Sequence, residues 1–205
     1  MTSNLTLTAG LALAALCCHS ASWAHQGPHD NQSAPSVAVS RSTVSVKLPA
    51  VPVRLQTGKL ITFDAAIDPN RPVLLNFIFT TCTGICLPMT QVFASAQDRL
   101  GAGAAMVQMV SVSIDPSQDT PAHLAEYAAR FSAGQQWSFS TGSQQAVDSI
   151  QQAFNVYRPD KMAHTPVTFV RPLHGQQWVR LDGFASPDQL IREAMAPNPN
   201  RPTAK

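Results

Sequence analysis

Residues 73–86 read VLLNFIFTTCTGIC and join an unbroken apolar run to two cysteines separated by three residues. The apolar run, residues 73–79, is typical of a strand that is buried on both faces of a sheet. After it, Ile85, Met89 and Phe93 recur at helical spacing, which predicts a helix that begins beside the cysteines. A buried strand that passes directly into a helix indicates a layered α/β fold.

The rest of the chain alternates strand and helix patterns around this stretch. Strands are predicted at 53–55 and 60–63, as a hairpin about residues 56–59, and at 106–114, 167–170 and 178–181. Helices are predicted after Thr120-Pro121, around 147–154 and after Ser186-Pro187. This order predicts a thioredoxin-like three-layer sandwich, with a central mixed β-sheet and an N-terminal hairpin.

Length and composition exclude several classes of protein. The chain has 205 residues, which suits one domain with tails. Its 44% hydrophobic and 13% charged residues, with a formal net charge of +2, match neither a disordered chain nor a nucleic-acid binder. We therefore expect no nucleic-acid partner.

The start of the chain indicates export. Residues 1–24 carry no charged side chain, and an apolar stretch at 5–16 is followed by Ser22-Trp23-Ala24, a pattern that a signal peptidase reads. The stretch is shorter than the roughly 20 residues that cross a bilayer. We expect a periplasmic protein whose signal is either cleaved or retained as a membrane tether. Cleavage leaves Cys82 and Cys86 as the remaining cysteines.

The exported chain divides into three parts. Residues 25–50 are rich in His, Gln, Ser and Pro and are predicted to be flexible, leading to an edge strand. Residues 51–196 form the predicted domain. Residues 197–205 form a proline-rich tail.

Cys82 and Cys86 are the first candidate site residues. Their position at the start of a helix favours the thiolate form and a lowered cysteine pKa. Residues four apart on a helix suit either a disulfide or two sulfurs that bind one ion. A disulfide that closes so short a loop stabilises the fold by only about 2 kcal/mol or less, which favours a chemical role over a structural one.

His164 is the candidate third ligand. Two thiolates leave a soft ion such as Cu(I) under-coordinated, and a neutral imidazole is a suitable further donor. His164 precedes the strand at 167–170, so its loop faces the turn that bears the cysteines. Five other side chains fit less well. His25 and His29 belong to a polar tail, and Met89 belongs to the apolar helix stripe. His123 is predicted on a helix surface and His174 in a turn. Asp115 either supports the site or ends its strand.

Three segments resemble the SCO/SenC family of copper-binding, thioredoxin-fold proteins that support assembly of cytochrome c oxidase. They are the run from Asn76 to Cys82 with Cys86, the segment 112–121 (VSIDPSQDTP), and His164-Thr165 before a strand. The resemblance covers residues 51–195. It implies that Cys82, Cys86 and His164 bind one copper ion, as Cu(I) or also Cu(II). It also implies a partner: the oxidase subunit that houses the CuA centre, another cuproprotein, or another periplasmic copper chaperone.

The surroundings of the cysteines depart from the family pattern. Family members commonly have proline after the first cysteine, then an acidic residue, and proline directly after the second cysteine. Here these positions hold Thr83, Gly84 and Leu87, and Ala163 stands where a polar residue often precedes the histidine. The three implied ligands are retained, and the surface that a partner would meet is altered.

Two functions remain open, and a third is disfavoured. The first is a metallochaperone without catalytic turnover. The second is a thiol-disulfide oxidoreductase in which Cys82 and Cys86 are the redox pair that reduces a partner's cysteines. A peroxidase of thioredoxin fold would need a Pro-x-x-x-Thr-x-x-Cys run, which the sequence lacks.

Overall fold

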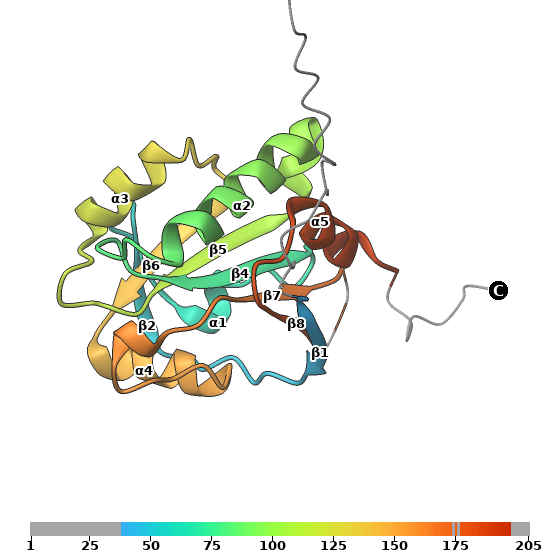
Figure 1. Cartoon of the computed structure of the whole chain (residues 1–205). Coiled ribbons are helices and arrows are strands. Elements are labelled where there is room, and N and C mark those ends of the chain that lie inside the picture. The colour runs from blue at the N-terminus through green and yellow to red at the C-terminus, as the bar shows by residue number, and fades with distance from the viewer. Residues whose placement is uncertain (1–37, 174, 176, 198–205) are drawn as a thin grey trace, which may run out of the picture. The chain divides into compact units, whose positions relative to one another are not determined.

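The computed structural model describes residues 38–173, 175 and 177–197, and these build an eight-stranded mixed sheet (Figure 1). The strand order is β1-β8-β7-β4-β5-β6-β2-β3. Strands β4, β5 and β6 are parallel, and β7 runs antiparallel beside β4. The strands are β1 Ser40–Val44, β2 Pro52–Leu55, β3 Leu60–Thr62, β4 Val73–Ile78, β5 Gln108–Ser113, β6 Trp137–Gly142, β7 Val167–Arg171 and β8 Trp178–Asp182.

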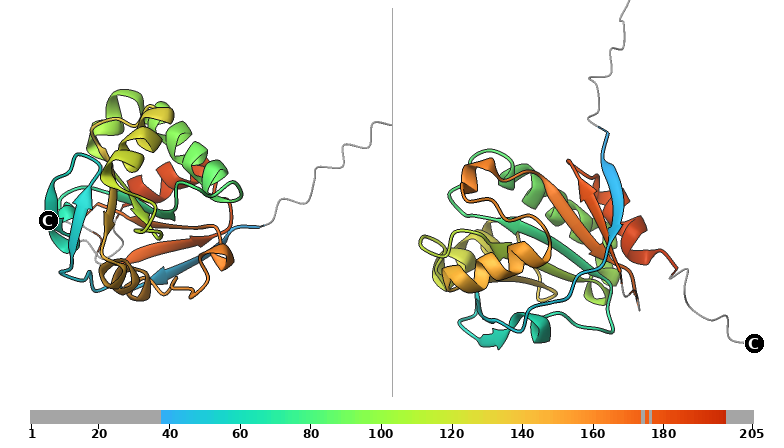
Figure 2. Two further views of the ribbon diagram at one scale, coloured as in Figure 1. Left: turned by 90° about the vertical axis from the view of Figure 1, so that its left-hand side faces the viewer. Right: turned by 90° about the horizontal axis from the view of Figure 1, so that it is seen from below.

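Helices cover both faces of the sheet. They are α1 Phe63–Ala66, α2 Cys86–Leu100, α3 Pro121–Arg130, α4 Gln144–Ala153 and α5 Pro187–Met195, with 3-10 turns η1 Gly101–Met106 and η2 Lys161–Ala163. Along β4, Leu74 and Ile78 join the core beneath α2, α3 and α5, whereas Phe77 joins the core beneath α1 and α4. Figure 2 shows the sheet between these two layers. The predicted three-layer sandwich is therefore confirmed.

The local signals that predicted α3 and α5 act as expected. Thr120 caps α3 by accepting a hydrogen bond from the His123 amide at 3.2 Å, and proline follows the cap. Ser186 caps α5 in the same way, accepting from the Gln189 amide at 3.2 Å. These caps satisfy amide groups that have no partner within the helix.

Two features of the sheet differ from the sequence predictions. Strand β6, with sequence WSFSTG, was not predicted, because serines, threonine and glycine masked its alternation. It is stabilised by pairing with β5 on one side and β2 on the other. The flexible segment predicted for 25–50 is wrong for Ser40–Val44, which pairs with β8 as edge strand β1.

The predicted signal at 1–24 and the tail beyond residue 197 lie outside the described residues. Within the described part of the chain, no helix has the length and apolar character that a membrane span requires.

Candidate metal centre

The two cysteines lie where β4 gives way to α2. The Cys82 amide donates to the Phe79 carbonyl at 3.1 Å, which turns the chain at the end of the strand. Cys86 is the first residue of α2, and its amide donates to the Cys82 sulfur at 3.4 Å. The Cys82 sulfur is therefore in contact with the first amide of the helix. Both residues are free thiols and belong to the hydrophobic core.

The expected effect of the helix start on both thiols is wrong for Cys86. Burial raises the pKa of the Cys86 thiol, and the neighbouring Cys82 sulfur raises it further. Cys86 is fully buried, so loss of solvation outweighs the attraction of the helix for a negative charge. The expected thiolate at Cys86 is thus replaced by a neutral thiol in the metal-free protein.

His164 lies between the 3-10 turn η2 and strand β7. The antiparallel pairing of β7 with β4 brings it to the strand that leads to the cysteines. Its Nε2 is 3.1 Å from the Phe77 carbonyl oxygen. Because a carbonyl only accepts, Nε2 carries the hydrogen. Burial lowers the pKa of His164, as does the charge of Arg158, so at neutral pH Nδ1 keeps its lone pair.

The structure brings the two cysteines together without closing a three-ligand site. Among residues 38–173, 175 and 177–197, no group of three or more His, Cys, Asp or Glu side chains could hold a metal ion. All three predicted ligands are nevertheless buried, with exposed fractions of 7% for Cys82, 0% for Cys86 and 8% for His164. Each of the three donors is therefore shielded from water, but the imidazole does not share an ion site with the two sulfurs in this conformation.

An open cleft of about 460 Å³ lies beside His164. One wall is the segment that contains Arg158, Lys161 and His164, and the opposite wall comes from helix α4, including Asp148 and Gln151. Neither cysteine lines this cleft. The cleft therefore borders the imidazole and neither of the sulfurs.

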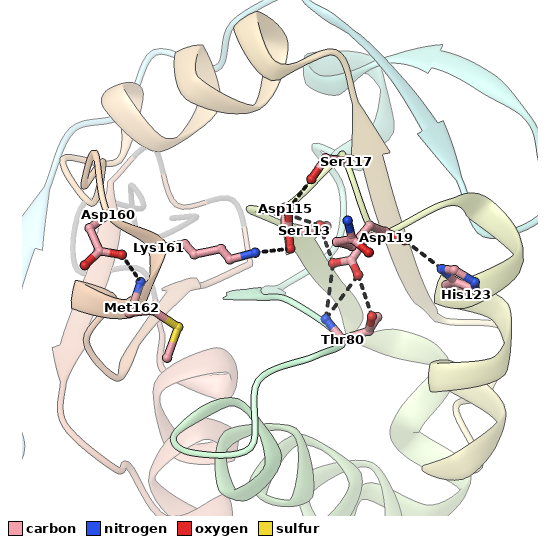
Figure 3. A network of polar contacts seen from close by, with 10 residues as sticks. Thr80, Ser113, Asp115, Ser117, Asp119, His123, Asp160, Lys161 and Met162 are labelled. Atoms are coloured by element: carbon pink, nitrogen blue, oxygen red, sulfur yellow. Dashed lines mark hydrogen bonds and ion pairs between the residues drawn. The ribbon is translucent and has the colours of Figure 1, made fainter.

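A buried polar network holds the cysteine segment (Figure 3). The Asp119 carboxyl group is fully buried and accepts from the Thr80 amide at 3.2 Å, the Thr80 hydroxyl at 2.5 Å and the Ser113 hydroxyl at 2.5 Å. Thr80 is two residues before Cys82. The loop between β5 and α3 therefore fixes the approach to the first cysteine.

The same network continues to the histidine segment. The Ser113 hydroxyl oxygen accepts from the Asp115 amide at 3.0 Å. The Asp115 carboxylate, itself buried, forms an ion pair with Lys161 at 2.5 Å. Lys161 also lies over the Phe79 ring, 5.4 Å from its centroid. A continuous chain of contacts thus links Thr80 to Lys161, three residues before His164.

Sequence reasoning missed most of this network. It considered Asp115 as support for the site, and the Lys161 ion pair gives that residue a partner. Asp119 lies in the segment 112–121 that carried the family resemblance, but no role was predicted for it. Thr80 lies in the run from Asn76 to Cys82 that also carried the resemblance, but no role was predicted for it, and Lys161 carried no recognisable signal. His123 is exposed on α3 and Met89 is buried, both as predicted.

Comparison with known proteins places the chain among relatives of one kind. The family model described as SCO1/SenC matches residues 56–195. The SCO1 protein homolog of Bacillus subtilis strain 168 is 39% identical over 92 residues, which are 44% of this chain and 47% of that protein. The chain therefore aligns with about half the length of that curated relative.

Two solved structures extend the likeness to the fold. BsSco, a member of the Sco family of cytochrome c oxidase assembly proteins with an identified disulfide switch, is 26% identical, with a TM-score of 0.61 over 75% of this chain and 94% of that chain. Copper-bound ScoI from Bradyrhizobium japonicum is 22% identical, with a TM-score of 0.57 over 69% of this chain and 96% of that chain. The architecture described above is therefore shared with both.

Proposed function

Because this chain belongs to the SCO1/SenC family, we propose that it is an exported metallochaperone that binds copper and passes it to a cuproprotein. It holds one ion through Cys82, Cys86 and His164. The observation that carries the proposal is the pairing of two free, buried thiols at the start of α2 with a buried imidazole beside β4. Copper-bound ScoI supports the choice of metal.

The donor types fit Cu(I). Two thiolates and a neutral imidazole are soft to intermediate ligands, which this closed-shell ion accepts at low coordination number. The Nε2 hydrogen of His164 is engaged by the Phe77 carbonyl, so Nδ1 is the nitrogen available to the metal. Both thiols release a proton on binding, since the thiolate is the ligand form.

To bind copper, the His164 imidazole must change its position, but it can keep the same tautomer. The histidine turn moves relative to the sulfurs until Nδ1 and both sulfurs meet the ion. Burial of all three donors then shields the bound copper from water and from unwanted oxidation. Release reverses the movement when a recipient offers competing ligands.

The proposed compartment and recipient are supported by the start of the sequence and by the relatives. The uncharged start of the chain supports export to the periplasm, with or without a retained membrane tether. Membership of BsSco in a family of cytochrome c oxidase assembly proteins supports the CuA-bearing oxidase subunit as recipient. Another periplasmic copper chaperone supplies the copper that this protein delivers.

A thiol-disulfide oxidoreductase is the second candidate function. It is favoured by the Cys82 sulfur, which accepts a hydrogen bond from the Cys86 amide at 3.4 Å. Cys82 is 7% exposed, whereas Cys86 is fully buried. Such a sulfur is suited to attack a partner's disulfide, with Cys86 resolving the mixed disulfide. The same two cysteines serve both functions, whereas His164 serves the first alone.

The decisive experiment is an anaerobic titration of the reduced, signal-free protein with Cu(I) against a competing chelator. We expect one ion per chain, no tight binding after Cys82→Ser or Cys86→Ser, and strongly weakened binding after His164→Ala. The matched control His123→Ala removes an exposed histidine on α3 and leaves binding unchanged. Binding that survives His164→Ala would contradict the three-ligand site, and no binding by the parent protein would favour the oxidoreductase.

A further inference from the structure

The proposed copper site has no ligand at the protein surface. Cys82, Cys86 and His164 are each less than a tenth exposed. A copper ion that arrives from a donor protein therefore needs a first ligand other than these three buried residues. Soft, neutral sulfur is the ligand type that Cu(I) prefers for such a contact.

Met162 places such a sulfur two residues before His164. Its side chain is 72% exposed, the largest value among the exposed large hydrophobic residues of the described chain. It belongs to η2, the turn that leads directly into the predicted ligand. Its thioether sulfur is therefore open to an ion that arrives from solvent.

Local hydrogen bonds hold the turn that carries Met162 together. The Met162 amide donates to the Asp160 carboxylate at 2.8 Å. The His164 amide donates to the Lys161 carbonyl at 3.2 Å, and Lys161 is held by Asp115. In Figure 3 the Met162 sulfur takes part in none of the marked interactions. The thioether and the imidazole are therefore attached to one short, constrained turn and move together.

We propose that Met162 is a transient surface ligand that receives Cu(I) and transfers it to the buried site. This inference rests on the proposed copper function. The transfer is a ligand exchange at constant oxidation state, in which copper leaves the thioether as it bonds to His164 Nδ1 and the two sulfurs. Each cysteine thiol passes its proton to water as its thiolate binds, and the neutral thioether neither gains nor loses a proton.

Met106 supplies a matched control. It is 58% exposed and ends the 3-10 turn η1, whereas Met162 is the middle residue of η2. That turn precedes the amino end of β5, whereas the site follows the carboxyl end of the neighbouring parallel strand β4. Met162→Leu thus removes an exposed sulfur from the turn that leads to His164. Met106→Leu removes an exposed sulfur near the opposite end of the parallel strands.

The test measures the rate of Cu(I) loading by stopped flow, with acetonitrile-stabilised Cu(I), and the affinity by chelator competition. We expect Met162→Leu to slow loading about tenfold, which corresponds to about 1.4 kcal/mol of activation free energy. Affinity changes little, because the final ligands are intact. Met106→Leu loads at the parent rate. Equal rates in both variants would overturn the inference while leaving the copper function standing, and a parent protein that binds no copper would overturn both.

A second measurement isolates the thioether itself. In a Cys82→Ser, Cys86→Ser double variant, Ag(I) replaces Cu(I) as the probe, and methionine methyl groups labelled with carbon-13 report binding by NMR. We expect the Met162 methyl signal to shift first and the Met106 signal to stay in place. Indistinguishable titration of the two signals would reject a specific ligand role for Met162.

Discussion

The cysteine segment, residues 80–86, and the histidine segment, residues 160–164, are held in different ways. The cysteine segment joins a strand paired on both sides to a helix, and its path is fixed by the Cys82 amide on the Phe79 carbonyl and by the Cys86 amide on the Cys82 sulfur. The histidine segment is a single 3-10 turn whose backbone bonds are local, and the side chains of Lys161 and His164 link it to the rest of the fold. The difference indicates that the cysteines form the fixed half of the site and the histidine the adjustable half.

One chain of polar contacts reaches both segments, and its two ends differ in burial. Asp119, near the cysteine end, is fully buried, whereas the Lys161 side chain at the histidine end is 41% exposed. Buried hydrogen bonds to a carboxylate contribute more to stability than a partly exposed ion pair. The two ends should therefore respond unequally to mutation.

The largest expected effect is at Asp119. Asp119→Asn replaces an oxygen that accepts hydrogen bonds with an amide that donates, facing the Thr80 and Ser113 donors. We expect the free energy of unfolding in urea to fall by about 3 kcal/mol. Asp148→Asn, at an exposed carboxylate that accepts from Gln144 at 2.8 Å, is the control and should change it by about 0.5 kcal/mol or less. Equal losses in the two variants would mean that Asp119 does not anchor the cysteine segment.

The parts of the fold that could be predicted are those with local signals. The apolar run of β4, the hairpin of β2 and β3, and the caps at Thr120 and Ser186 are each complete within a few residues. Strand β6 could not be predicted in this way, because its pairing with β5 and β2 stabilises a serine-rich segment that lacks a clear pattern.

In the candidate site, too, the features with a local sequence pattern could be predicted and those that depend on tertiary contacts could not. The spacing of Cys82 and Cys86 is visible in the sequence, and His164 could be chosen because it precedes a strand. The contact between Lys161 and Asp115 joins residues 46 positions apart and has no local pattern. The high pKa of the Cys86 thiol also depends on tertiary burial, which a helix-start argument does not include.

A pH-dependent effect of intermediate size is expected at His164 in the metal-free protein. Burial lowers the pKa of the folded imidazole below its ordinary value of 6.5. As the pH falls below about 6.5, the unfolded chain takes up a proton at this residue before the folded chain does. The free energy of unfolding therefore falls, by at most about 1.4 kcal/mol per pH unit, until the folded pKa is reached.

His164→Gln removes this dependence, and comparison with the parent protein by urea unfolding between pH 7.5 and 5 measures it. This pH range brackets the ordinary histidine pKa of about 6.5. His123→Gln at the exposed face of α3 controls for the general loss of a histidine. If the parent protein and His164→Gln lose stability with the same slope, the imidazole is not shielded in the folded chain.

The smallest expected effect on stability is at Lys161, where the comparison between the two segments is sharpest. Lys161→Gln removes the ion pair with Asp115, and we expect the free energy of unfolding to fall by about 1 kcal/mol. Arg99→Gln, which breaks an exposed pair with Asp188, is the matched control and should leave the free energy of unfolding nearly unchanged, because solvent screens that pair.

Hydrogen exchange distinguishes a local loosening at Lys161 from a general loss of stability. In Lys161→Gln we expect faster exchange of the Met162 and His164 amides, which depend on the turn for their hydrogen bonds, and unchanged exchange of the Cys86 amide. A turn freed in this way also lets the imidazole approach the sulfurs more often, so Cu(I) loading should become faster rather than slower. Equal acceleration of exchange in both segments would show that they loosen as one unit, and the division into a fixed and an adjustable half would then be wrong.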